Sequence, residues 1–184
     1  MEAGAHKALR QARLGRVEEH VSHENAHNLD AVMETFSALS YYDEEPWGEH
    51  HVGHEAVRGH YEQLFLAAPD LLIDIHRRHV TEEAVILECE ISGTHEGSWR
   101  GLPPTGRRIS FPICAIYDFE DDGDKLACER IYYDRATELN QLGVMHEPES
   151  PLGRVLTALT HPITLGRALA RRARSQPHRD LAGK

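Results

Sequence analysis

The sequence lacks the features of several large protein classes. No run of about 18 consecutive apolar residues occurs, so no transmembrane segment is predicted. The first residues, Met1 to Leu14, are polar and charged and lack the apolar core of a secretory signal. No glycine-rich loop precedes a predicted helix and no serine nucleophile elbow is found, which disfavours nucleotide binding and serine hydrolysis. Any chemistry is therefore expected to be proton transfer without an organic cofactor.

Cysteine is scarce, and the number of cysteines is odd. The three cysteines, Cys89, Cys114 and Cys128, are widely spaced and fall in predicted strands. Such a set is no disulfide framework, so reduced thiols in the core of a cytoplasmic protein are expected.

Basic residues are also few, except at the C-terminus. The net charge is −10, yet the chain from Pro151 onward carries seven basic residues against one acidic residue. The remainder therefore has a charge of −16, which repels phosphate backbones and makes nucleic acid an unsuitable partner.

Hydrophobic periodicity divides the first part of the chain into helices followed by strands. Helical spacing predicts helices over residues 5–27, from Asn28 or Asp30 through Leu39, 55–67 and 135–142. Alternation predicts a short strand at 41–45 and longer strands at 71–75, 85–92, 108–119 and 126–134. Helices first and an antiparallel meander afterwards indicate an α+β fold. We expect one domain over residues 1–146, then a linker and a basic helical tail over 147–184.

Several short motifs resemble one known family. They are Val52-Gly53-His54-Glu55-Ala56-Val57, Ala68-Pro69-Asp70-Leu71, the Gly93 to Arg107 loop, Tyr132-Tyr133-Asp134 and Gln141-Leu142-Gly143. Together with the helical start, they make residues from about Arg16 to Val144 similar to SnoaL-like polyketide cyclases of the nuclear-transport-factor-2-like superfamily. The resemblance implies a cone-shaped α+β barrel, in which a curved antiparallel sheet wraps around N-terminal helices and encloses an apolar cavity. It also implies a homodimer and a hydrophobic small-molecule ligand.

Two side chains at strand ends are the candidate catalytic pair. Alternation from Val85 carries the apolar face of one strand to His95, and alternation in the closing strand places Cys128, Arg130, Tyr132 and Asp134 on one side. If both faces are concave, His95 and Asp134 share the cavity, where burial would raise the pKa of the aspartate. In SnoaL-like cyclases a cavity Asp with an assisting His performs acid–base catalysis, and Asp134 and His95 match these roles. Alternatively, Asp134 caps the following helix, and Glu129 on the opposite side is the reserve acid–base candidate.

Six further residues are candidate substrate contacts. Arg130 and Tyr132 have the donors to orient a ligand, although Arg130 could instead pair with Glu88 or Glu90. Trp47 and Trp99 are candidate pocket aromatics, and Glu24 and His27 are candidate polar contacts at the cavity mouth.

A zinc-protease pattern also occurs, at His23-Glu24-Asn25-Ala26-His27. In H-E-x-x-H two histidines on one helix face hold zinc. Here the pattern lies next to the helix break expected at Asn28, and no third ligand stands out, so no metal is expected. A metal-dependent enzyme using His23 and His27 remains an alternative.

The sequence therefore favours a cofactor-independent cyclase, isomerase or hydratase acting on an apolar, carbonyl-bearing small molecule. A non-catalytic ligand-binding or assembly module of the same fold is the alternative from another class. For the Leu-rich first half of the tail we expect packing on the body or on a second subunit.

Overall fold

The structure is a computed structural model of the whole chain, and it describes residues 2–121, 123–147 and 149–175. The helices of the described chain are α1 (Glu2–Asn25), α2 (Leu29–Thr35), α3 (His54–Ala67), α4 (Arg135–Gln141), α5 (Pro151–Thr160) and α6 (Pro162–Ser175). The strands are β1 (Phe36–Glu44), β2 (Glu49–Val52), β3 (Leu72–Val80), β4 (Ala84–Thr94), β5 (Arg108–Phe119) and β6 (Leu126–Tyr133). Contacts divide the chain into two compact units, Met1–Val144 and Met145–Lys184.

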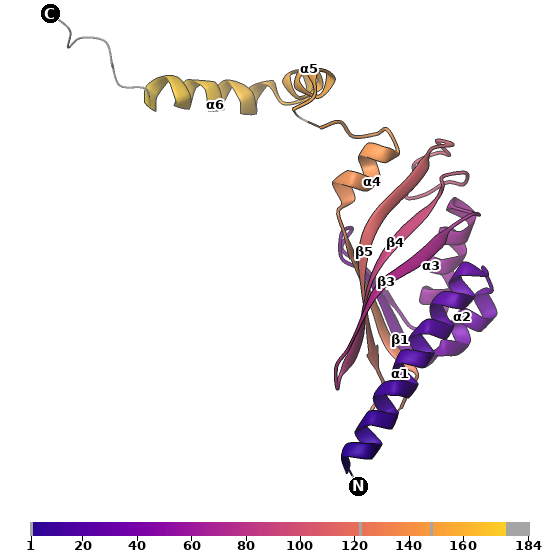
Figure 1. Cartoon of the computed structure of the whole chain (residues 1–184). Coiled ribbons are helices and arrows are strands. Elements are labelled where there is room, and N and C mark those ends of the chain that lie inside the picture. Colours follow the sequence, from indigo (N-terminus) through magenta and orange to yellow (C-terminus); the bar gives the residue numbers. More distant parts are fainter. Residues whose placement is uncertain (1, 122, 148, 176–184) are drawn as a thin grey trace, which may run out of the picture. The chain divides into compact units, whose positions relative to one another are not determined.

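The first unit is a mixed α+β fold built on a curved sheet, as expected. Its six strands follow the order β2-β1-β6-β5-β4-β3, so β2 and β3 are edges and the sheet is not closed. Figure 1 shows α1, α2 and α3 on one side of the bent strands. Register shifts interrupt the β1–β6, β3–β4 and β5–β6 pairs, and such irregularities increase the bend and twist of a sheet.

One pairing corrects the antiparallel expectation. β1 runs parallel to β6, whereas the other neighbouring strands are antiparallel. The cause is a boundary that helical spacing missed, because α2 ends at Thr35 and the chain continues as β1 from Phe36. Residues 47–54, which lie between the expected strand at 41–45 and the expected helix at 55–67, contain the short β2, which folds back on β1 after Gly48 at a positive φ of 65°.

The hydrophobic core fills the space between the sheet and the helices. Val17 and Val21 of α1, Val57 and Tyr61 of α3, and alternate residues of the strands are buried in one cluster. This alternation is clear in β4, where Val85, Leu87 and Cys89 are buried. The inward face of β4 therefore continues toward the cavity described below.

The second unit contains two amphipathic helices. Ser150 caps α5, its side chain accepting a hydrogen bond from the Gly153 backbone N–H, and Pro162 begins α6. The last residues of the tail, 176–184, lie outside the described residues. Within the described part of the chain, no helix is both long enough and apolar enough to cross a lipid bilayer.

Candidate active site

An apolar cavity lies between the inner face of the sheet and helices α1 and α3. Including its open mouth, the space between its walls is about 850 Å³. Most of the wall is aliphatic or aromatic, with contributions from Leu64, Ile91, Phe111, Ile113 and Tyr117. A few polar side chains interrupt this wall, and they define the candidate site.

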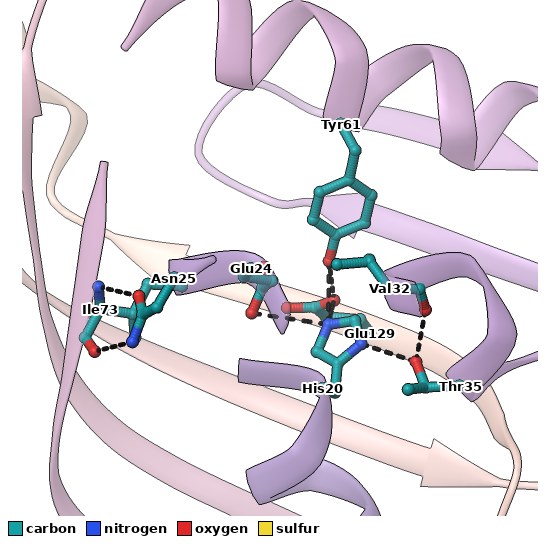
Figure 2. A network of polar contacts seen from close by, with 8 residues as sticks. All are labelled: His20, Glu24, Asn25, Val32, Thr35, Tyr61, Ile73 and Glu129. Carbon is teal, nitrogen blue, oxygen red and sulfur yellow. Dashed lines mark hydrogen bonds and ion pairs between the residues drawn. The ribbon is translucent and has the colours of Figure 1, made fainter. Parts of the chain in front are cut away.

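Three ionisable side chains converge at one part of this wall: His20 and Glu24 from α1 and Glu129 from β6 (Figure 2). Their exposed fractions are 0%, 2% and 2%. The Nε2 atom of His20 lies 3.1 Å from Oε2 of Glu129 and 3.5 Å from Oε2 of Glu24. Both glutamates line the cavity.

The local sequence explains why α1 presents this pair. His20 and Glu24 are four residues apart, so they share one helix face, and Val17 and Val21 adjoin that face in the core. At the end of α1, the Asn25 amide donates to the Ile73 carbonyl at 2.9 Å and accepts from the Ile73 backbone N–H at 2.7 Å (Figure 2). This double hydrogen bond fixes the helix end to β3 and directs Glu24 toward the cavity.

Hydrogen bonds fix the proton positions in the cluster. The Thr35 hydroxyl donates to the Val32 carbonyl at 2.6 Å, so its oxygen is free to accept from His20 Nδ1, 2.7 Å away. The Tyr61 hydroxyl donates to Glu129 Oε2 at 2.5 Å. His20 is therefore protonated at Nδ1, and its Nε2 faces the carboxylates.

Burial and mutual charge shift the pKa values of this cluster. Desolvation lowers the pKa of His20, but Glu24 and Glu129 outweigh that effect, so the His20 pKa is raised. Desolvation, assisted by the charge of Glu129, raises the pKa of Glu24 to about 8, although His20 and Tyr61 oppose the shift. Near neutral pH Glu24 is therefore a buried acid, and it lies beside the His20–Glu129 contact in one apolar wall.

His95 also lies in the cavity wall and is 3% exposed. Its Nδ1 accepts a hydrogen bond from the Thr105 backbone N–H at 3.2 Å, so the proton of the neutral ring is on Nε2. Desolvation lowers the pKa of His95 and favours this neutral form. The buried Nε2 has no hydrogen-bond partner among the described residues, which makes it a donor available to a ligand oxygen.

A second polar group lies along the same wall. The Tyr133 hydroxyl donates to Glu44 at 2.5 Å, and Trp47 Nε1 donates to Tyr133 at 2.8 Å and to Glu138 at 3.2 Å. Glu44 and Glu138 are 5% and 4% exposed, and burial raises the pKa of Glu138. This network holds β1, β6 and α4 together beside the cavity.

Arg100 holds the loop between β4 and β5 against this network. Its guanidinium contacts the carboxylates of Glu44 and Glu49. It also lies over the rings of Trp47 and Trp99, 4.8 and 4.5 Å from their centroids. Both terminal nitrogens of the guanidinium are therefore used within the protein.

Asp134 does not share the cavity with His95, which corrects the expected pairing. The Asp134 carboxylate is exposed and caps α4, accepting from the Ala136 backbone N–H at 2.9 Å and from the Thr137 hydroxyl at 2.7 Å. These hydrogen bonds lower its pKa. The reason is that the face of β6 with Glu129, Ile131 and Tyr133 lines the cavity, and Asp134 belongs to the alternation of the opposite face.

The same inversion places two expected substrate contacts on the outer face. Tyr132 is 42% exposed, and Arg130 pairs with Asp43 and Asp118 at 3.4 and 3.6 Å. Neither side chain lines the cavity. Arg130 also does not use Glu88 or Glu90, because β5 lies between β6 and β4.

The other expected contacts are distributed around the cavity. Glu24 and Trp99 line it, whereas Trp47 stands behind the wall and reaches it through Tyr133 and Glu138. His27 stacks on Phe65 and hydrogen-bonds the Leu71 carbonyl at 3.0 Å, which is a structural role.

The H-E-x-x-H pattern does not form a zinc-binding helix face. The helix α1 ends at Asn25, and His27 has a positive φ of 51°, so His23 and His27 are not on successive turns. Among the described residues, two other sets have ligand atoms close enough to surround a cation: His20 with Glu24 and Glu129, and Glu49 with His51 and His60. In the first set His20 and Glu129 are hydrogen-bonded to each other, so their ligand atoms are already used. In the second set Arg100 contacts Glu49, and its positive charge competes with a cation.

Sequence reasoning missed His20, Tyr61 and the Glu44–Glu138 network. A signal existed for His20, because it lies four residues before Glu24 on the valine-rich face of α1. No comparable signal existed for Tyr61, whose partner Glu129 is 68 residues away.

Comparisons with known proteins agree with this architecture. A protein-family model described as SnoaL-like polyketide cyclase matches residues 13–142. A search of curated proteins gave no significant match. Among solved structures, AclR from Streptomyces galilaeus is similar with 23% identity and a TM-score of 0.63, over 73% of this chain and 97% of that chain.

Two more solved structures illustrate the range of the fold. A SnoaL-like protein from Jannaschia sp. CCS1 is 16% identical with a TM-score of 0.68, over 75% of this chain and 96% of that chain. The epoxide hydrolase/cyclase-like enzyme SalBIII, described for a role in pyran ring formation in the polyether salinomycin, is 18% identical with a TM-score of 0.58, over 68% of this chain and 92% of that chain. At these identities the likeness concerns the fold.

Proposed function

Because the chain belongs to the SnoaL-like polyketide cyclase family, we propose that it is an enzyme that cyclises, isomerises or hydrates an apolar, carbonyl-bearing small molecule without a cofactor. One observation carries the proposal: a buried acid, Glu24, and a buried base, Glu129, open into one apolar cavity around His20. Two carboxyl groups that reach one substrate, one to give a proton and one to take it, are what general acid–base catalysis requires.

In the proposed ring closure Glu129, His95 and Glu24 each have one role. The Glu129 carboxylate takes a proton from the carbon next to the substrate carbonyl, and the C–H electron pair moves into an enolate. The Nε2–H of His95 donates a hydrogen bond to the enolate oxygen. In a ring closure the enolate carbon attacks a second carbonyl, and Glu24 gives its proton to the new alkoxide. Transfer of the proton from Glu129 back to Glu24 restores the starting state.

His20 and Tyr61 act as positioning residues in this scheme. They contact Glu129 at 3.1 and 2.5 Å but stand behind the cavity wall. Their hydrogen bonds hold the Glu129 carboxyl group in one orientation within an apolar wall. SalBIII, which shares this fold, has a role in pyran ring formation, and this supports the cyclase class here.

The proposal is tested by following α-proton exchange of acetophenone in D₂O by NMR. The native protein should accelerate exchange, and Glu129→Gln should reduce that acceleration about 10²–10⁴-fold. Glu62→Gln, an exposed carboxylate on α3, is the matched control and should retain it. Circular dichroism and thermal unfolding check that each variant folds.

Two results would contradict catalysis. A native protein that binds the ketone without exchanging its protons would be a non-catalytic binding module, the alternative function of the same cavity. Full exchange in folded Glu129→Gln would remove Glu129 as the base.

We also propose that the protein is a homodimer. Leu39, Val52 and Leu66 are 86%, 64% and 71% exposed in the single chain, which is apolar surface available for association. Light scattering of the purified chain should give twice the chain mass of 20.8 kDa, and a monomer mass would refute the dimer.

A further inference from the structure

The cavity wall contains more acidic side chains than its chemistry requires. Glu24 of α1, Glu44 of β1, Glu129 of β6 and Glu138 of α4 all line it, and each is at most 5% exposed. No lysine or arginine belongs to the lining residues. Carboxyl groups at this depth are costly unless a positive charge or a donor compensates them.

The histidines of the wall do not supply that charge. His95 accepts a hydrogen bond at Nδ1 and is held in its neutral form. Burial, followed by the effects of His51 and Arg100, lowers the pKa of His60 to about 3, so it is also neutral. The nearest cations stand outside the wall: His20 is shared between two carboxyl groups, and Arg100 is occupied by Glu44 and Glu49.

One carboxyl oxygen remains without a donor. Glu24 Oε2 is buried and has no hydrogen-bond partner among the described residues, and its side chain lines the cavity. His20 Nε2 lies 3.5 Å from this oxygen, beyond a good hydrogen bond, so the oxygen can still accept one from a ligand in the cavity. An anionic ligand is disfavoured, because no lysine or arginine of the lining would meet its charge and it would oppose ionisation of Glu24.

Aromatic rings form much of the remaining cavity wall. The wall includes Tyr42, Trp99, Phe111, Tyr117 and Tyr133. Ring faces attract cations, and the attraction is stronger where water is excluded. Carboxyl groups and aromatic rings together form an environment suited to an alkylammonium group.

We propose that the ligand of this cavity carries a protonated amine, whose N–H donates to Glu24 while the aromatic wall surrounds its alkyl groups. This inference rests on the proposed function, because it names the class of substrate for the same cavity: an apolar carbonyl compound with a basic nitrogen. The amine places a positive charge beside Glu24 and so stabilises the ionised form of this carboxyl group, which is buried without a hydrogen-bond donor.

The test compares three small probes of nearly equal size: benzylamine, benzyl alcohol and benzoate. Binding to the full chain is followed by NMR titration at pH 8.5, above the raised pKa of about 8 of Glu24, where this carboxyl group is ionised and benzylamine is still protonated. Benzylamine should bind about tenfold more tightly than benzyl alcohol, because a charge-assisted hydrogen bond replaces a neutral one. Benzoate should not bind.

Glu24→Gln identifies the group responsible. This variant should lose the preference for benzylamine over benzyl alcohol, because its amide carries no negative charge, and circular dichroism and thermal unfolding verify that it folds. Glu62→Gln should behave as the native protein. Equal affinities for the amine and the alcohol, or an unchanged preference in Glu24→Gln, would overturn the inference.

The two proposals fail separately. If Glu129→Gln loses ketone exchange and the native protein shows no preference for benzylamine, the acid–base enzyme is supported and the amine-bearing substrate is refuted. If the native protein prefers benzylamine but does not exchange ketone protons, amine binding is supported and the enzymatic proposal is refuted.

Discussion

Glu24 couples the protonation of the cavity to the stability of the fold. Its pKa is raised from 4.5 to about 8, so the folded chain holds this proton more tightly than the unfolded chain. The free energy of unfolding therefore falls as the pH rises from about 4.5 to about 8. His20, whose pKa is also raised, acts in the same direction, because the stability it contributes below pH 6.5 is lost as the pH passes its folded pKa.

Glu24→Gln removes the first of these contributions. We expect the stability of the variant relative to the native protein to be greater at pH 8.5 than at pH 5 by up to about 4 kcal/mol, since about three pH units separate pH 5 from the Glu24 pKa of about 8 and each corresponds to about 1.4 kcal/mol. Urea unfolding at both pH values measures the difference. Glu62→Gln should follow the native pH dependence, and a parallel pH dependence in Glu24→Gln would contradict the assignment.

At the same scale, the sequence predicts some side-chain directions and not others. The apolar alternation of β4 is unambiguous, and it leads to His95. In β6 both faces carry polar and apolar groups, with Arg130 and Tyr132 on one and Glu129 and Tyr133 on the other. Periodicity alone does not decide which of these faces lines the cavity, so the sequence predicts an inward Asp134 as readily as an inward Glu129.

Among the elements, the loop after β4 depends on a single glycine. The backbone N–H groups of Glu96 and Gly97 both donate to the Ala67 carbonyl at the end of α3, at 2.9 and 3.1 Å. A Cβ atom on Gly97 would lie 2.1 Å from the Leu66 carbonyl oxygen. This oxygen is a backbone atom and cannot move away as the end of a flexible side chain could. The close approach of loop and helix therefore requires glycine.

Gly97→Ala should destabilise the fold by about 1–3 kcal/mol, as overpacking against backbone does. It should also weaken benzyl alcohol binding, because the loop carries Trp99 of the cavity wall. Gly59→Ala within α3 is the control: a Cβ there meets no atom within 4 Å, and alanine favours a helix. Denaturant unfolding of both variants provides the comparison, and equal stability of Gly97→Ala and native protein would refute the tight contact.

Most elements were predictable, whereas their pairing was not. β5 was expected over its observed range, and α3 and α4 within one residue at each end, because their patterns are regular and their ends carry capping or turn residues. The start of β1 was missed because Phe36 and Leu39 continue the spacing of α2. Its parallel partner β6 lies about 90 residues later, and no local pattern encodes that contact.

For the molecule as a whole, all the buried residues of the main apolar cluster belong to the first unit, Val17 through Ile131. The second unit exposes Leu152, Val155 and Leu159 of α5 and Leu169 of α6. Basic, amphipathic helices of this type were expected from the sequence. The cluster itself needs none of their residues.

A chain that ends at Ser150 should therefore fold with a free energy of unfolding within about 1 kcal/mol of the full chain, since no core side chain is removed. Urea unfolding measures stability, and light scattering on the same samples measures mass. A larger loss of stability would mean that the tail packs on the body, and a change in mass would mean that it joins subunits.

The helix that closes the cavity also brings its proton carriers. His20 and Glu24 come from α1, while Glu129 lies 109 residues away from His20. If the end of α1 detached alone, the buried Glu129 carboxyl group would lose the imidazole 3.1 Å away, and a buried polar group that loses a hydrogen-bond partner costs stability. The first turns of the helix can fray freely, but its last turns are bound to the sheet as one cooperative unit. The molecule therefore cannot lose its reactive groups gradually: they exist together in the native state or not at all.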